Sequence, residues 1–443
     1  MRRLILLLGL AFALAACNNG SSSETTTTTA PPITSESQAP TTTVAEETTT
    51  TEADMPDVTP LGLDDLSAEL RSEVLELVEL TQELRELRFL EPPVITVVDN
   101  EELARRVRET IEEEVEGVDA DEALYALLGL IPAETDLLAL YTDLYGEQVA
   151  GFYDGDEGEL VIPSGSSLTP LQRATLIHEL THALTDQHFE MSANYEALVD
   201  EERFDEASAY LSVIEGDATL TEILYIQDLP VAQQQALISE SLEADSTAFD
   251  AAPRFIRDSL IFPYQEGFAF TQRLFELGGF FEIEKAYSKP PLSTEQILEP
   301  RDFGRDLPID VAAPVQTLDG YEFVYDSVWG ELGFDTMFDQ ILGDDASRTA
   351  SDGWGGDRYS YFYDGTEAAL VLNYRADSER DAEEMETALV AYIQAAMAVG
   401  NETQIAGFDV FSGDDFAAVV RDGTAVTFVA ASDPAAGTTL IGG

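Results

Sequence analysis

Basic residues, cysteine and histidine are all scarce in this sequence of 443 residues. Cys17 is the only cysteine, so the chain cannot form an intramolecular disulfide. Lysine occurs only at Lys285 and Lys289, and Lys and Arg together number 22 against 86 Asp and Glu. The net charge of −64 repels nucleic acid and anionic lipid head groups. We therefore expect no nucleic-acid partner, and a surface that stays soluble in salt because screening relieves its self-repulsion.

No hydrophobic run in the sequence is long enough to span a membrane. The apolar stretch Leu4–Leu14 follows two arginines and has the length of a secretory signal rather than of a transmembrane helix. The next residues end in LAAC, which resembles the lipobox of bacterial lipoproteins, where the cysteine is lipidated after cleavage. We therefore expect residues 1–17 to be a lipoprotein signal peptide. Cys17 would then anchor the protein outside the cytoplasm, on the bacterial cell membrane.

The remaining chain divides into three parts by composition. Residues 18–60 consist mainly of Thr, Ser, Pro and Glu, bury too little apolar surface to fold, and predict a disordered stalk. Residues 61–312 combine helical hydrophobic spacing with short β-favouring runs, two of which flank the turn-rich sequence DGDEG at 154–158 and predict a β-hairpin. From about 313 to 443, the strand-like runs YSYFYDG and AALVLNYR precede one long helical segment, DAEEMETALVAYIQAAM, and the strand-like runs FDVFSG, FAAVVRD and AVTFVAA follow it. The pattern predicts an α+β protein, with a mainly helical domain containing a small sheet and a smaller C-terminal α+β domain.

All three histidines fall within the stretch LIHELTHALTDQHF, residues 176–189. The sequence TPLQ at 169–172 predicts a helix start with a capping box just before it. On a helix, His178 and His182 of HExxH lie one turn apart on one face, so both imidazoles can bind a single metal ion. Glu179 lies beside them and can accept a proton from a metal-bound water. Zinc is the expected ion, because imidazole and carboxylate ligands suit it.

A catalytic zinc usually has three protein ligands, and two residues compete for the third position. His188 has the spacing of the metzincin motif HExxHxxGxxH, but Thr185 stands where that motif has glycine. A β-branched residue is poorly suited to the positive φ of that turn, and the metzincin methionine turn has no counterpart downstream. Glu215 lies in an otherwise apolar helical stretch, where a carboxylate is unfavourable without a cation. We favour Glu215 as the third ligand and keep His188 as the alternative.

Four residues are candidates for supporting roles. Asp186 and Asp217 could orient a ligand imidazole by accepting a hydrogen bond from its other ring nitrogen, and His188 would then be a helix-end residue or support a ligand from there. For Tyr264, in FPYQEGFAF, we favour a packed core tyrosine, and the alternative is that it donates a hydrogen bond to a tetrahedral intermediate. The segment WGGDRY at 354–359 predicts a turn that enters a strand.

Several segments together resemble a family of bacterial secreted or lipid-anchored zinc metallopeptidases of zincin type. The resemblance covers residues 140–395 and is carried by GFYD, LIHELTHALTDQHF, VIEGDAT, PPLSTEQILEP and GWGGDRY. HExxH with a downstream EGDA is its specific part, and it implies a gluzincin-like set of two histidines and one glutamate around zinc. The family often has a histidine before the proline equivalent to Pro300, whereas this chain has Glu299, so no metal role is expected there.

The family also implies how a substrate would bind. In zincins a strand at the sheet edge precedes the active helix and binds an extended peptide by strand addition. Here that strand would be Gly151–Asp154 or Leu160–Ile162. These expectations together predict a lipid-anchored, zinc-dependent metallopeptidase that cleaves peptides or proteins, with Glu179 as general base. The alternative function is a non-catalytic envelope binding or assembly module on the same zinc-binding scaffold.

Overall fold

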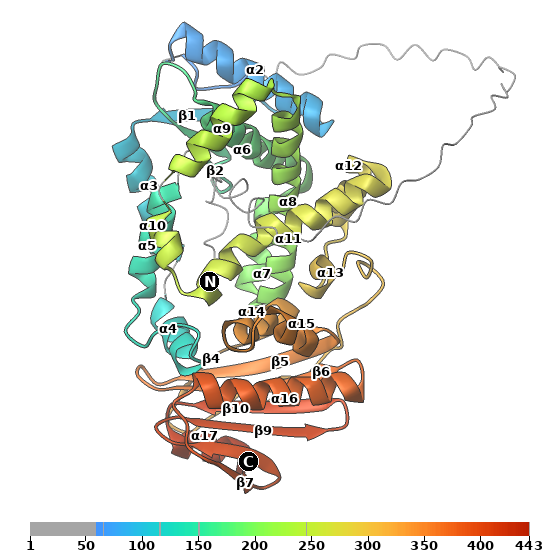
Figure 1. The fold of residues 1–443 in the computed structure, drawn as a ribbon. Coiled ribbons are helices and arrows are strands. Elements are labelled where there is room, and N and C mark those ends of the chain that lie inside the picture. Colours follow the sequence, from blue (N-terminus) through green and yellow to red (C-terminus); the bar gives the residue numbers. More distant parts are fainter. Residues whose placement is uncertain (1–58, 65, 115–116, 149–150, 245, 443) are drawn as a thin grey trace, which may run out of the picture.

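The structure, a computed structural model, describes residues 59–442 except 65, 115–116, 149–150 and 245. The predicted signal peptide, the lipidation site Cys17 and nearly all of the predicted stalk lie outside these residues. Figure 1 shows a helical part above and a layered part of helices and strands below. Within the described residues, no helix is both long enough and apolar enough to cross a bilayer.

Helices make up most of the first two thirds of the described chain. In chain order they are α2 (Ala68–Arg85), α3 (Asn100–Glu114), α4 (Val118–Leu127), α5 (Leu137–Gln148), α6 (Pro170–Phe189), α7 (Met191–Asp200), α8 (Phe204–Asp228), α9 (Val231–Glu243), α10 (Thr247–Ala251), α11 (Arg254–Gly278), α12 (Phe280–Ser288), α13 (Glu295–Leu298), α14 (Gly330–Leu342), α15 (Asp344–Ser351), α16 (Glu379–Ala396) and α17 (Pro434–Gly442).

The strands form two separate sheets. They are β1 (Val94–Val98), β2 (Phe152–Asp154), β3 (Glu159–Pro163), β4 (Glu322–Ser327), β5 (Trp354–Tyr363), β6 (Ala368–Ala376), β7 (Glu402–Ile405), β8 (Phe408–Ser412), β9 (Phe416–Asp422) and β10 (Ala425–Ala431). The first sheet has the order β1-β3-β2, and the second, antiparallel sheet has the order β4-β5-β6-β10-β9-β8-β7. The predicted α+β class is therefore confirmed.

The small sheet settles which of the two predicted strands lies at its edge. β2 and β3 form the predicted antiparallel hairpin, and β1 adds to the other side of β3 in parallel. β3 is therefore the central strand, with both sides hydrogen-bonded. The expectation that Leu160–Ile162 could be an edge strand is wrong, and Phe152–Asp154 in β2 lies at an edge instead.

Helix α6, which contains HExxH, begins with the predicted capping box. The hydroxyl of Thr169 accepts a hydrogen bond from the Gln172 backbone N–H at 3.2 Å, and the Gln172 side chain accepts one from the Thr169 N–H at 3.0 Å. Pro170 fits the first turn because its missing N–H would have no intrahelical partner there. The helix ends at Phe189, where Glu190 adopts the left-handed conformation with φ 50°.

Helices α8 and α11 approach each other closely at two glycines. A Cβ added to Gly216 would overlap the carbonyl oxygen of Gly267, and one added to Gly267 would overlap that of Ser212. Only glycine permits this backbone contact. The crossing also places Glu215, which precedes Gly216 on α8, near Tyr264, which lies one turn before Gly267 on α11.

Gly267→Ala is expected to lower the free energy of unfolding by about 1–3 kcal/mol, because overpacking outweighs the gain in helix propensity. Gly278→Ala, at the end of the same helix, is the matched control, since there a Cβ meets only the movable side chain of Glu282. Urea denaturation of both variants measures the difference. Equal midpoints for the two variants would show that the crossing tolerates a side chain.

The C-terminal sheet shares a buried core with the helices that precede it. One continuous apolar cluster includes residues of α4, α5 and α11 together with residues of β5, β6, β10 and α16. Tyrosines cross the junction: the hydroxyl of Tyr325 donates to Asp121 at 2.8 Å, and that of Tyr392 donates to the carbonyl of Leu128 at 2.7 Å. The sequence change near residue 313 therefore does not mark a boundary between two independent cores.

Most elements predicted for the C-terminal part are present, with one correction. Strands β5, β6, β8, β9 and β10 and helix α16 match the predicted runs. The segment 354–359, expected to be a turn that enters a strand, already belongs to β5, with a register shift between Trp354 and Gly356. Strands β4 and β7 and helices α14, α15 and α17 were not predicted.

Candidate metal centre

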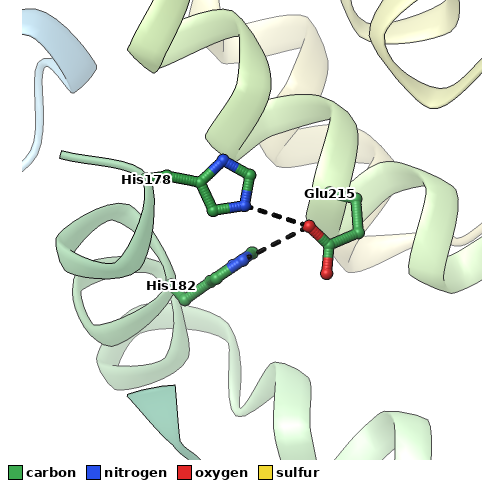
Figure 2. Close-up of side chains that lie close together, drawn as sticks. All are labelled: His178, His182 and Glu215. Carbon is green, nitrogen blue, oxygen red and sulfur yellow. Dashed lines mark hydrogen bonds and ion pairs between the residues drawn. The ribbon is translucent and has the colours of Figure 1, made fainter. Parts of the chain in front are cut away.

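Two histidines of α6 and one glutamate of α8 converge in the interior of the helical part. The Nε2 atom of His178 lies 3.1 Å from Oε2 of Glu215, and the Nε2 atom of His182 lies 3.4 Å from the same oxygen, as Figure 2 shows. One potential ligand atom from each residue lies within 4.8 Å of the other two. Each of the three residues is at most 2 % exposed.

The spacing of these three side chains suits a tetrahedral metal. Zinc–ligand distances of about 2.0–2.1 Å place two ligand atoms of a tetrahedron about 3.3 Å apart. The distances of 3.1 and 3.4 Å between imidazole nitrogen and carboxylate oxygen are close to that value. Two imidazoles and one carboxylate are also a donor set that zinc accepts at catalytic sites.

The electrostatics of the centre favour a positive charge among the three side chains. Burial alone lowers the pKa of His178, but its contacts with the carboxylates of Glu215 and Glu222 outweigh this and raise it to about 10. For Glu215 the two effects have the opposite signs. Burial raises its pKa, but its contacts with His182 and His178 outweigh this and lower the pKa overall. A cation at this point would provide the charge that the buried carboxylates require.

Glu179 is held by one carboxylate oxygen, which leaves the other available. Its Oε2 accepts a hydrogen bond of 2.8 Å from the backbone N–H of Tyr153 on β2. Its Oε1 is buried and has no hydrogen-bond partner among the described residues. Burial raises the pKa of Glu179, and the nearby histidines oppose this in part. A raised pKa brings a carboxylate closer to the range in which a general base works near neutral pH.

Tyr264 of α11 lies against the centre. Its ring centroid is 6.3 Å from that of His178. Burial raises the pKa of Tyr264 well above its usual value, and the negative charge of Glu215 and a hydrogen bond with Glu215 raise it further. The phenol therefore stays protonated, and its hydroxyl is hydrogen-bonded to Glu215. Tyr264 lies beside the ligand residues and is at the same time a buried core residue, 3 % exposed.

Glu222 belongs to the centre but was missed from the sequence. Its Oε2 lies 3.3 Å from Nδ1 of His178, and its side chain is 1 % exposed. It stands seven residues after Glu215, so both side chains project from the same face of α8. The sequence contains this spacing, but among 86 acidic residues it does not distinguish Glu222 from the others. Glu222 occupies the position of a carboxylate that orients a metal-binding imidazole.

Asp186 and Asp217 do not have the roles expected for them. Asp186 accepts hydrogen bonds from the hydroxyl of Tyr153 at 2.8 Å and from the hydroxyl of Ser192 at 3.0 Å. Asp217 pairs with Arg85 at 2.9 Å and accepts a hydrogen bond from the hydroxyl of Tyr287 at 3.1 Å. Both carboxylates are therefore occupied by other groups, and Glu222 stands where a supporting acid was expected.

His188 lies away from the three converging residues. Its Nε2 donates to the carbonyl of Arg88 at 2.8 Å, near the end of α6. The helix continues without a break through Thr185, so no turn brings His188 back toward His182. The arrangement therefore argues against His188 as the third ligand.

Glu295, Asp306 and Asp377 also place carboxylate oxygens within 4.8 Å of one another. They are partly or fully exposed, and acidic side chains are abundant on this surface. This cluster contains no histidine and lies apart from HExxH.

Comparisons with known proteins concern mainly the C-terminal part. A family model described as "Domain of unknown function (DUF8575)" matches residues 320–440. This match covers the seven-stranded sheet and does not include the candidate metal centre. No curated protein and no solved structure matches the chain. Functional conclusions about the centre therefore depend on its own geometry and chemistry.

Proposed function

We propose that this protein is a zinc-dependent metallopeptidase with a zincin-like, gluzincin-type centre, anchored outside the cytoplasm through Cys17. The observation that carries the proposal is the convergence of His178, His182 and Glu215 with the available carboxylate oxygen of Glu179 beside them. The first three would hold the ion, and the fourth would move the proton. Their substrates would be peptides or proteins.

Each residue of the centre has a defined task in peptide hydrolysis. A bound zinc ion supplies a Lewis acid for the scissile carbonyl and lowers the pKa of a water molecule. Oε1 of Glu179 accepts the proton of the attacking water and then donates it to the leaving amine. The protonated Tyr264 would donate a hydrogen bond to the oxygen that gains negative charge once its hydroxyl leaves the carboxylate of Glu215, to which it is bonded here. The edge strand β2 can pair with an extended substrate, because no other strand of the described residues covers one of its sides.

The burial of the centre adds a condition. His178, Glu179, His182 and Glu215 are each at most 2 % exposed, so a peptide reaches them only when surrounding elements move. Tyr145 of α5 is close enough to Tyr264 to affect its pKa, which makes α5 one of the elements near the centre. A binding module would not need this opening, and cleavage is therefore the decisive observation.

Glu179→Gln is expected to lower the rate of zinc-dependent cleavage of a peptide library by about 10²–10⁴-fold, the usual contribution of a general base. The amide cannot accept the proton, whereas the metal ligands are unchanged. Metal analysis of the purified variant should still find zinc. Glu157→Gln, at an exposed position in the β2–β3 turn, is the matched control and should cleave like the wild type.

Cleavage by Glu179→Gln at the wild-type rate would refute the mechanism. If the wild-type protein binds zinc but cleaves no peptide over a broad range of conditions, the non-catalytic binding module becomes the better description.

Glu222→Gln is expected to weaken zinc binding by about 10–100-fold, because the neutral amide orients the His178 imidazole less strongly. Competition with a chromophoric chelator measures the affinity. Glu243→Gln, at an exposed position at the end of α9, is the matched control. An unchanged affinity in Glu222→Gln would show that this carboxylate only fills space behind His178.

A further inference from the structure

A cavity of about 120 Å³ lies between the helical part and the C-terminal sheet. Its walls come from α4, α8 and α11 on one side and from β4, β5 and α14 on the other. None of the residues of the candidate metal centre lines it. Its size is comparable to that of an engineered cavity of about 150 Å³ that binds benzene. The space therefore suits a small ring or a branched group.

Aromatic side chains form much of the cavity wall. Tyr125, Phe255, Tyr325, Trp329 and Tyr359 all line it. Their rings contact one another in series: Tyr125 and Phe255 at 5.2 Å, Phe255 and Trp329 at 6.3 Å, Trp329 and Tyr359 at 5.7 Å, and Tyr359 and Tyr325 at 6.0 Å. An aromatic enclosure of this kind attracts cations, because the faces of the rings carry partial negative charge.

Two carboxylates line the same cavity. Asp121 accepts the hydroxyl hydrogen of Tyr325, and Asp205 accepts hydrogen bonds from the hydroxyl and the backbone N–H of Thr294, at 2.6 and 3.2 Å. Among the described residues, no arginine, lysine or histidine contributes to the lining. Asp205 is 5 % exposed, and burial raises its pKa to about 7. At neutral pH Asp205 is therefore partly protonated, and a bound cation would favour its ionised form because the cation supplies the missing positive charge.

We propose that this cavity binds a small organic cation, an amine carried on an apolar group of about the size of benzene. The aromatic walls would enclose the apolar group and the ammonium head, and Asp121 and Asp205 would balance its charge. This site is separate from the proposed zinc centre, and its occupation does not depend on the peptidase function.

Benzylammonium is the probe, and benzyl alcohol is its neutral counterpart of nearly the same shape. Trp329 lines the cavity and is one of only two tryptophans, whereas the other, Trp354, does not line it and donates its indole N–H to Asp357. Titration of the full chain, followed by tryptophan fluorescence, should show benzylammonium binding about tenfold more tightly than benzyl alcohol. In Trp329→Phe the fluorescence change should disappear, while calorimetry still detects binding.

Asp121→Asn should reduce the preference for the cation at least severalfold, because one of the two charges is gone. Asp119→Asn is the matched control, since Asp119 is exposed on the same helix and does not line the cavity. Both variants lose one negative charge, so the control also accounts for the nonspecific attraction of any cation to a chain with a net charge of −64. Equal binding of the two probes, no binding of either, or an unchanged preference in Asp121→Asn would overturn the proposal.

Discussion

Glu215→Ala is expected to reduce zinc affinity by more than about 100-fold. Loss of a residue that only orients a ligand reduces affinity by about 10–100-fold, and loss of a ligand itself should cost more. The change removes one of three ligands and leaves the imidazoles of His178 and His182 without the carboxylate that both contact. His188→Ala should leave the affinity within a few-fold of wild type. The side chain of His188 bonds to the backbone of Arg88 instead.

Zinc affinity is measured by competition with a chromophoric chelator, and circular dichroism shows whether each variant is folded. Glu215→Gln serves as a second variant, because it keeps the shape of the side chain and removes its charge. If Glu215→Gln loses about as much zinc affinity as Glu215→Ala, the carboxylate is identified as a ligand. If His188→Ala instead lost the metal and Glu215→Ala kept it, the metzincin-like ligand set would be correct.

The elements that carry the centre could be predicted because their signals are local. The capping box at Thr169 and the apolar neighbours of HExxH predict α6, and the turn-rich DGDEG sequence predicts the β2–β3 hairpin. Glu215 was found because a carboxylate in an apolar helical stretch needs a partner. In each case the information lies within a few residues of the feature that it predicts.

The remaining features depend on contacts between distant segments. Nothing near β1 in the sequence shows that it pairs in parallel with β3, about sixty residues later. The closeness of α8 and α11 requires glycine at two positions that have no motif in common. Asp217, a candidate for orienting a ligand imidazole, is two residues from Glu215, and because a helix turns by about 100° per residue its side chain points away from that of Glu215. Its partner Arg85 is 132 positions distant.

Arg85 is expected to be one of the largest contributors to stability, because its charge is buried together with that of Asp217. The side chains of both residues are 0 % exposed, and Nε of Arg85 lies 2.9 Å from Asp217. The guanidinium also lies 4.3 Å from the ring centroid of Phe280. Arg85→Met should therefore lower the free energy of unfolding by about 3–5 kcal/mol, since it leaves the carboxylate of Asp217 buried without its cation. Urea denaturation followed by circular dichroism measures this.

Two comparisons separate the buried pair from a general effect of charge. Arg71→Met removes a partly exposed arginine of the same helix and should change stability by less than about 0.5 kcal/mol. Arg85→Met combined with Asp217→Leu should be less destabilised than Arg85→Met alone, because replacing both members of a buried pair removes the unpaired charge. If the double variant loses the sum of the two single losses, Arg85 stabilises α2 through packing on Phe280 rather than through Asp217. A small loss in Arg85→Met would mean that Tyr287, which donates to Asp217, is sufficient to keep this carboxylate buried.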